Sequence, residues 1–137
     1  AHVVLLHTKS GDPKDKQPQI GDWLWSELWT NKPKESYVFY RNIVGYNGYE
    51  MRDEYRILKK NNIWRAGIRE IAKEEFKARW VPVVRVADLQ ETMSKVKSAG
   101  GEILVSPHDE LVDGNVALIS DNRGAVVIIQ YWNEGGE

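Results

Sequence analysis

The sequence predicts an α+β protein built from two copies of one βαβββ module. The main observation is that the order strand, helix, three strands occurs twice, at about residues 22–71 and 79–132. A second observation is that one shift of 56 positions superposes Trp25 on Val81 and the two helix patterns on each other. We therefore expect residues 22–137 to form a single two-module domain with a half-open, curled sheet.

The first module begins with DWLWSELWT at residues 22–30, a strand with large apolar residues on both faces. A helix follows, with Asn31 as its expected N-cap, Pro33 in its first turn and Gly45 as its stop. Residues 46–71 break at polar turns into YEM, YRILK and IWRAGIREI, which predict an antiparallel meander.

The second module repeats this order with clearer signals. RWVPVVRVA at residues 79–87 is strand-like, and a helix follows with Asp88 as N-cap, Glu91 three residues later and Gly100 as stop. Three further strands are predicted in GEILVS, NVALIS and AVVIIQYW, separated by turns rich in Asp, Gly and Asn. These strands complete the second βαβββ unit.

Residues 1–21 are expected to stand apart from the two modules. HVVLLHT at residues 2–8 predicts an extra strand, and the polar, Pro- and Gly-containing stretch after it predicts an exposed linker. VVLLH at 3–7 also resembles VVIIQ at 126–130, the last strand of the second module, so an alternative is that residues 1–21 are the end of a preceding module. We expect this extra strand to pair with a sheet edge, in its own chain or in a neighbour, which would give a homodimer.

Composition excludes several classes of function. Nineteen basic and twenty acidic residues give a formal net charge of -1, without the basic block that a nucleic-acid partner requires. The apolar runs are far shorter than the roughly 20 residues of a membrane span. The absence of cysteine excludes disulfides and thiolate chemistry and leaves the cellular compartment open.

The motifs W.EL.T, WVPVVRVADL, AGGEILVSP and DNRGAVVIIQYW resemble the vicinal oxygen chelate superfamily, and the resemblance covers residues 22–132. This superfamily includes glyoxalase I, bleomycin-resistance proteins and extradiol dioxygenases. The resemblance implies that the paired modules curl their strands into a cup that holds a small organic molecule.

The resemblance also implies where a metal would be held, on the first and last strands of each module. Carried onto this sequence, three of these positions are Trp25, Val81 and Ile128, none of which can ligate a divalent cation. The fourth position falls within residues 63–71, where Glu70 is the nearest candidate. We therefore expect neither a metal site nor a cofactor.

Candidate ligand-binding residues come first from the strand at residues 22–30. Alternation places Trp23, Trp25, Glu27 and Trp29 on one face, which the resemblance turns into the cup. Three indoles beside a carboxylate fit a flat or cationic ligand. A buried carboxylate also requires a partner, because burying an unpaired charge costs several kcal/mol.

We expect Glu27 to pair with either Arg65 or Arg85. The candidate ligand-binding set is therefore Trp25, Glu27, Trp29, Arg65 and Arg85. The three histidines, His2, His7 and His108, are interpreted as structural or solvated because no second ligand stands at metal spacing.

These features favour a small-molecule-binding domain that lacks the usual metal site. Two alternatives stay open. One is a glyoxalase-like lyase or isomerase, or a dioxygenase-like enzyme, with Glu27 as base. The other is a dimerisation or scaffold module whose cup is filled by side chains.

Overall fold

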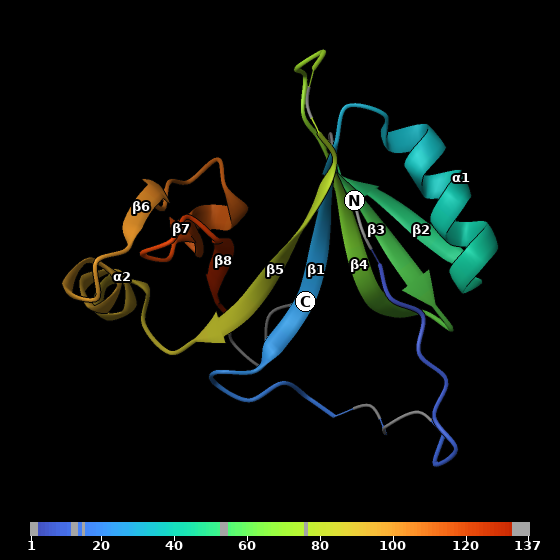
Figure 1. Ribbon diagram of the computed structural model, residues 1–137, viewed down its shortest axis with the longest axis horizontal. Coiled ribbons are helices and arrows are strands. Elements are labelled where there is room, and N and C mark those ends of the chain that lie inside the picture. The colour runs from blue at the N-terminus through green and yellow to red at the C-terminus, as the bar shows by residue number, and fades with distance from the viewer. Residues whose placement is uncertain (1–2, 12–13, 15, 53–54, 76, 133–137) are drawn as a thin grey trace.

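The computed structural model describes residues 3–11, 14, 16–52, 55–75 and 77–132 and shows the two predicted modules as one continuous sheet (Figure 1). Its eight strands follow the order β2-β3-β4-β1-β5-β8-β7-β6. The first strands of the two modules, β1 and β5, pair antiparallel at the centre, and each pairs in parallel with the last strand of its own module. The expected α+β fold of two βαβββ modules is confirmed.

The first module contains one helix and four strands, and all of them match the expected segments. Its elements are β1 (Trp23–Thr30), α1 (Pro33–Val44), β2 (Gly48–Arg52), β3 (Tyr55–Lys60) and β4 (Ile63–Glu70). The second module repeats the series with one added 3-10 turn. Its elements are β5 (Arg79–Val86), α2 (Leu89–Ser98), β6 (Glu102–Val105), η1 (Val112–Gly114), β7 (Val116–Ser120) and β8 (Val126–Tyr131).

The two helices cover the outer face of the curled sheet at its opposite ends (Figure 1), and the inner face, here called the cup, lines a cavity. Beneath α1, Tyr40 packs on Leu28, Leu58 and Ile68, which are almost completely buried. Beneath α2, Met93 packs in the same way within the second module. Leu28 is therefore sealed under a helix, as the alternation of β1 predicts.

The helix starts agree with the sequence in one module and differ in the other. Asp88 caps α2 through its side chain, which accepts a hydrogen bond from the backbone N–H of Glu91. Asn31 does not cap α1, whose N-cap is Lys32 without a side-chain hydrogen bond. The amide of Asn31 instead donates to the carbonyls of Lys73 and Glu74 across the β4–β5 loop. A tertiary contact thus replaces the local cap.

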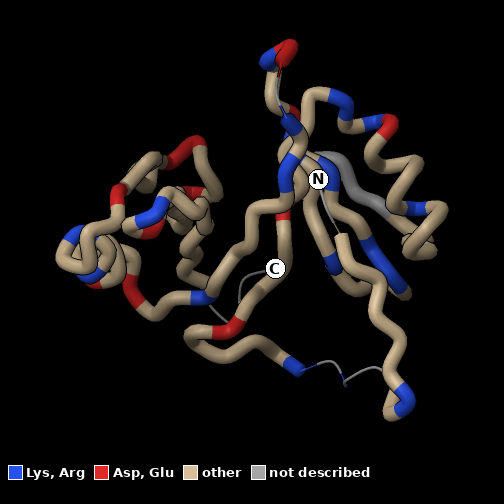
Figure 2. The backbone as a smooth tube through the Cα atoms, viewed as in Figure 1, with Lys and Arg blue, Asp and Glu red and all other residues tan. Residues whose placement is uncertain are grey.

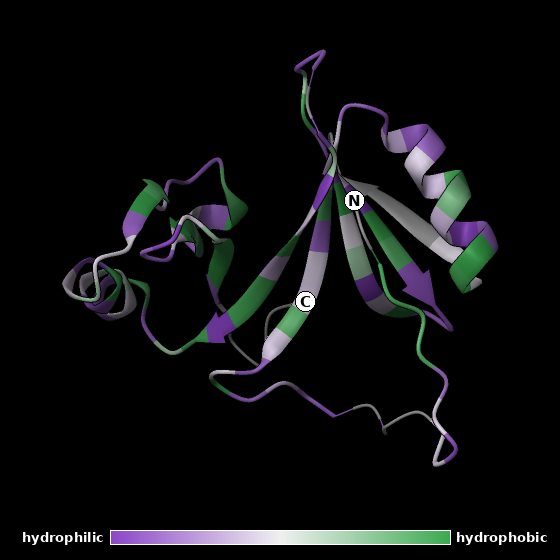
Figure 3. Ribbon diagram, viewed as in Figure 1, coloured by the Kyte–Doolittle hydropathy of each residue, from purple (hydrophilic) through white to green (hydrophobic). Residues whose placement is uncertain are grey.

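The expected extra N-terminal strand is not formed by the residues of this segment that the structure describes. Residues 3–8 belong to no helix or strand, and Val4, Leu5 and Leu6 are 91%, 76% and 82% exposed. Figure 3 shows this segment as hydrophobic and lying outside the sheet. A single strand gains its hydrogen bonds only from a partner, and in the described residues none of the sheet's edges supplies one.

None of the helices in the described part of the chain is long and apolar enough to cross a membrane. Figure 2 shows acidic and basic residues interspersed along the backbone of both modules.

Candidate functional site

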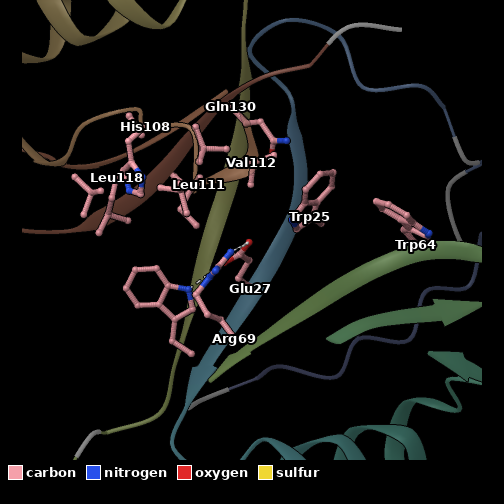
Figure 4. A pocket seen from close by; sticks show the side chains of 14 residues that line it. Trp25, Glu27, Trp64, Arg69, His108, Leu111, Val112, Leu118 and Gln130 are labelled. Carbon is pink, nitrogen blue, oxygen red and sulfur yellow. Dashed lines mark hydrogen bonds and ion pairs between the residues drawn. The ribbon is translucent and has the colours of Figure 1, made fainter. Parts of the chain in front are cut away.

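The cup contains a cavity of about 300 Å³ between the inner faces of the two modules (Figure 4). This volume is at the lower end of the range of small-molecule pockets. Its lining is mainly apolar and aromatic with a few polar groups, and consists of Trp25, Glu27, Trp29, Trp64, Arg69, Val105, His108, Leu111, Val112, Val116, Ala117, Leu118, Ile128 and Gln130.

Strand β1 supplies Trp25, Glu27 and Trp29 to this cavity, as the alternation predicts. Trp23 does not line this cavity, because a β-bulge interrupts the pairing with β5. The register shifts between Trp23 and Trp25, which leaves Leu24 as an extra, unpaired residue. One extra residue turns the preceding side chain to the other face of the strand. Trp23 is therefore 62% exposed and lies outside the cup lining, which corrects the expectation that it shares the face of Glu27.

A second register shift decides which residues β4 supplies. Leu58 pairs with Ala66 and Lys59 with Trp64, so Arg65 is the extra residue of the bulge. Simple alternation would place Arg65 on the same face as Arg69. With the bulge, Trp64 and Arg69 line the cavity, whereas Arg65 lines a separate surface hollow with Tyr46 and other residues.

Glu27 is 6% exposed and has Arg69 as its ion-pair partner. The Nε of Arg69 donates to Oε2 of Glu27 at 3.1 Å and Nη2 donates to Oε1 at 3.4 Å. The indole Nε1 of Trp29 donates to the same Oε2 at 3.0 Å. The contact follows from strand order, because β4 lies beside β1 and Trp29 is the register partner of Arg69.

Tyr55 of β3 supports this pair from the neighbouring strand. Its hydroxyl donates a hydrogen bond to Glu27, and the guanidinium carbon of Arg69 lies 4.9 Å from the centre of its ring. Gly67 is the β4 residue opposite Glu27, and a Cβ there would overlap the Tyr55 hydroxyl. The missing side chain at Gly67 is therefore what allows a residue two strands away to contact the carboxylate.

The ionisation of these groups is coupled. Burial and the negative charge of Glu27 raise the pKa of Tyr55 well above its ordinary value, so the phenol stays protonated and remains a donor. Burial alone would lower the pKa of Arg69, but the charge of Glu27 and its hydrogen bond outweigh this and raise it. The indole nitrogen of Trp25 is also buried near the Tyr55 hydroxyl, outside hydrogen-bonding geometry.

The second module forms the opposite wall of the cup. His108, Leu111 and Val112 come from the segment between β6 and β7, and Gln130 comes from β8 (Figure 4). Val112 has a φ of 51°, which is strained for a β-branched residue. Backbone strain of this kind is common where a loop is shaped around a ligand.

The structure brings three of the five sequence candidates into one cavity. Arg85 lies elsewhere: its Nη1 donates to the carbonyl of Pro18 at 2.6 Å and ties the residues before β1 to β5. Arg65 also lies outside the lining. The sequence did not single out four further lining residues as ligand-binding candidates: Trp64, Arg69, His108 and Gln130. Alternation within β4 would have found Arg69 as readily as Arg65, but no local signal marks the other three.

The donor set of the cup does not fit the metal centre that the resemblance implies. Of the three assigned positions, Trp25 and Ile128 line the cavity and Val81 is buried beside it, and none has a metal-binding atom. The carboxylate of Glu27 is already engaged by Arg69 and by the donors Trp29 and Tyr55. Across the described ranges, no group of three or more His, Asp or Glu residues is placed to hold a metal ion.

Two βαβββ modules curled around a ligand-sized cup are the fold of the vicinal oxygen chelate superfamily. The comparisons with known proteins agree with this class. The chain is 30% identical over 112 residues to "Putative glyoxylase CFP32" of Mycobacterium bovis and of Mycobacterium tuberculosis, a match that covers 79% of this chain. It spans 43% of the length of those relatives. No family model matches the chain.

Solved structures show the same fold at low sequence identity. Methylmalonyl-CoA epimerase of Streptomyces coelicolor, in complex with 2-nitronate-propionyl-CoA, has a TM-score of 0.61 at 13% identity, over 85% of this chain and 97% of that one. A glyoxalase/bleomycin resistance protein/dioxygenase superfamily member from Vibrio splendidus has a TM-score of 0.56 at 13% identity, over 79% and 97%. The fold that this resemblance predicted from the sequence is thus confirmed.

Proposed function

We propose that this domain binds a small, flat organic molecule in its cup without a metal ion. The observation that carries the proposal is the cavity itself, which joins aromatic walls to a buried ion pair. A cup retained only as a scaffold would be filled by side chains, so an open cavity of about 300 Å³ favours binding over the scaffold alternative.

The shape of the expected ligand follows from the indoles. Trp25 and Trp29 lie on β1, whereas Trp64 lies on β4 and is 43% exposed. Aromatic side chains offer flat faces to planar groups and gain about 0.5–1.5 kcal/mol per ring pair beyond the burial of area. A ligand with one or two fused rings therefore suits the cup better than a flexible chain.

We include the absence of a metal in the proposal because the side chains that line this cup do not form a set of metal ligands. We expect purified protein to contain less than one equivalent of zinc, nickel, iron or manganese, measured by elemental analysis. One equivalent held by two or more side chains of the cup would overturn this part of the proposal.

The geometry gives no comparable support to Glu27 as a catalytic base. Its oxygens already accept hydrogen bonds from Arg69, Trp29 and Tyr55, so few of its acceptor positions remain for a substrate. We therefore do not propose for this domain any of the enzymatic activities that the relatives are named for.

The test uses 2-naphthalenemethanol, a neutral two-ring probe, titrated into the protein by calorimetry. We expect saturable binding with one site per chain. The variant Trp64→Ala should weaken binding roughly two- to tenfold, as the loss of one aromatic contact implies.

Trp23→Ala is the matched control, because Trp23 is also an exposed tryptophan but lies outside the cup. It should leave the dissociation constant unchanged. Absence of saturable binding, or equal weakening by the two variants, would overturn the proposed function.

A further inference from the structure

We infer that the cup selects ligands whose polar end is a carboxylate or another hydrogen-bond acceptor, anchored by Arg69, and rejects ligands with an ammonium group. The inference rests on the proposed function, since it assigns the chemical class of ligand to the same cavity. It also reverses the preference for a cation that three tryptophans beside a glutamate suggest.

The first step is that Glu27 is covered by its own partners. Its side chain is 8% exposed. Oε2 accepts from both Arg69 and Trp29, Oε1 accepts from Arg69, and Tyr55 adds a further donor. A carboxylate has about four acceptor positions, so little capacity remains for a ligand cation.

The second step is that Arg69 is the more accessible member of the pair. Its side chain is 30% exposed and it lines the cavity. Among the contacts of the described residues, its hydrogen bonds go to Glu27 through Nε and Nη2, which leaves N–H groups of the guanidinium for an acceptor. The buried ion pair therefore presents its cationic side to the cup.

The third step is that this cation is held in place rather than mobile. The ring of Tyr55 lies against the guanidinium, and two hydrogen bonds to Glu27 fix its plane. An arginine fixed in this way loses little conformational entropy when a ligand binds. Hydrogen bonds between a guanidinium and a carboxylate are also about twice as strong as neutral ones.

The other polar groups of the cup fit the same class of ligand. Gln130 offers an amide N–H, and His108 offers an imidazole at the opposite wall (Figure 4). The acidic residues of the segment between β6 and β7 are exposed and absent from the lining: Asp109, Glu110 and Asp113. Water and salt screen such exposed charges, so they oppose the effect of Arg69 only weakly.

The test compares three probes with one ring system and different head groups: 2-naphthoate, 2-naphthalenemethanol and 2-naphthylmethylamine. Calorimetric titrations at about pH 8 keep histidines largely uncharged in general while the carboxylate and the ammonium stay ionised. We expect naphthoate to bind roughly tenfold or more tightly than the amine, with the alcohol between them.

Two variants separate the role of Arg69 from a general effect of charge. Glu27→Gln/Arg69→Gln removes both charges together, so neither partner is left buried alone, and the preference for naphthoate should collapse to within about threefold of the alcohol. Arg123→Gln removes an exposed arginine in the turn before β8 and should change none of the three dissociation constants. Circular dichroism confirms that each variant is folded.

The outcomes distinguish the inference from the proposed function. If the alcohol binds but the amine binds as tightly as naphthoate, the inference is wrong and the binding function stands. The same conclusion follows if the double variant keeps the full preference for naphthoate. If none of the three probes binds, the proposed function itself is overturned, and the inference with it.

Discussion

Replacing Gly67 by alanine should expel Tyr55 from its position beside Glu27. A Cβ at residue 67 would overlap the Tyr55 hydroxyl, and even the more distant ring atom Cε2 would lie only 2.8 Å away. Ordinary van der Waals contact begins near 3.4 Å. Because Gly67 lies in the interior of the sheet between β1 and β3, the backbone cannot move aside and the ring must withdraw.

The cost combines two effects. Loss of a hydrogen bond to a charged acceptor costs about 1.5–3 kcal/mol, and crowding a packed site costs about 1–3 kcal/mol. The reduced flexibility of the unfolded chain returns about 0.4–1 kcal/mol. We therefore expect Gly67→Ala to lower the free energy of unfolding by about 2–5 kcal/mol, measured by urea denaturation.

A double-mutant cycle with Tyr55→Ala tests the mechanism. Once the ring is gone, Gly67→Ala should be neutral or slightly stabilising, so the two changes are strongly non-additive. Gly48→Ala is the matched control in another strand, where the new Cβ would meet Lys59 at an ordinary 3.6 Å. An equal loss from Gly67→Ala with and without the Tyr55 ring would refute the reasoning.

Three further predictions concern the core, the phenol and assembly. Leu28→Ala should cost about 2–5 kcal/mol in urea denaturation because Leu28 is 1% exposed, whereas Val38→Ala, at a site 54% exposed, should cost much less; equal losses would contradict the placement of the core. The raised pKa of Tyr55 means that its stabilisation is fully present below its ordinary value of 10.0 and is lost as the pH rises toward the higher folded-state value. In an alkaline titration of tyrosinate absorbance, Tyr55→Phe should therefore remove a component that appears only above pH 10.0, and a component lost at lower pH would disprove the assignment. Because Val4, Leu5 and Leu6 are exposed in a single chain, the homodimer remains a prediction, and deleting residues 1–12 should weaken self-association in sedimentation velocity; an unchanged oligomeric state and stability would argue against it.

The sequence determined the order of elements and the two-module fold of this protein. Strand alternation, helix periodicity and the cap at Asp88 are local signals, and each depends on residues only a few positions apart. The same local signals placed Trp25, Glu27 and Trp29 in the cup and Leu28 in the core. The expectation that Glu27 needs a cationic partner follows equally from the sequence, because a buried lone charge is too costly.

Only the tertiary structure decided which cation pairs with Glu27 and which aromatic residues face the cavity. Arg65 and Arg69 are equivalent by alternation, and the choice between them depends on a bulge set by the pairing of β3 with β4. A second bulge, between β1 and β5, turned Trp23 out of the cup. The contact of Tyr55 with Glu27 across Gly67 requires three strands in register, and no single segment contains that information. Bulges and register arise from the balance of packing on both faces of the whole sheet, so residues far apart in the chain decide them together.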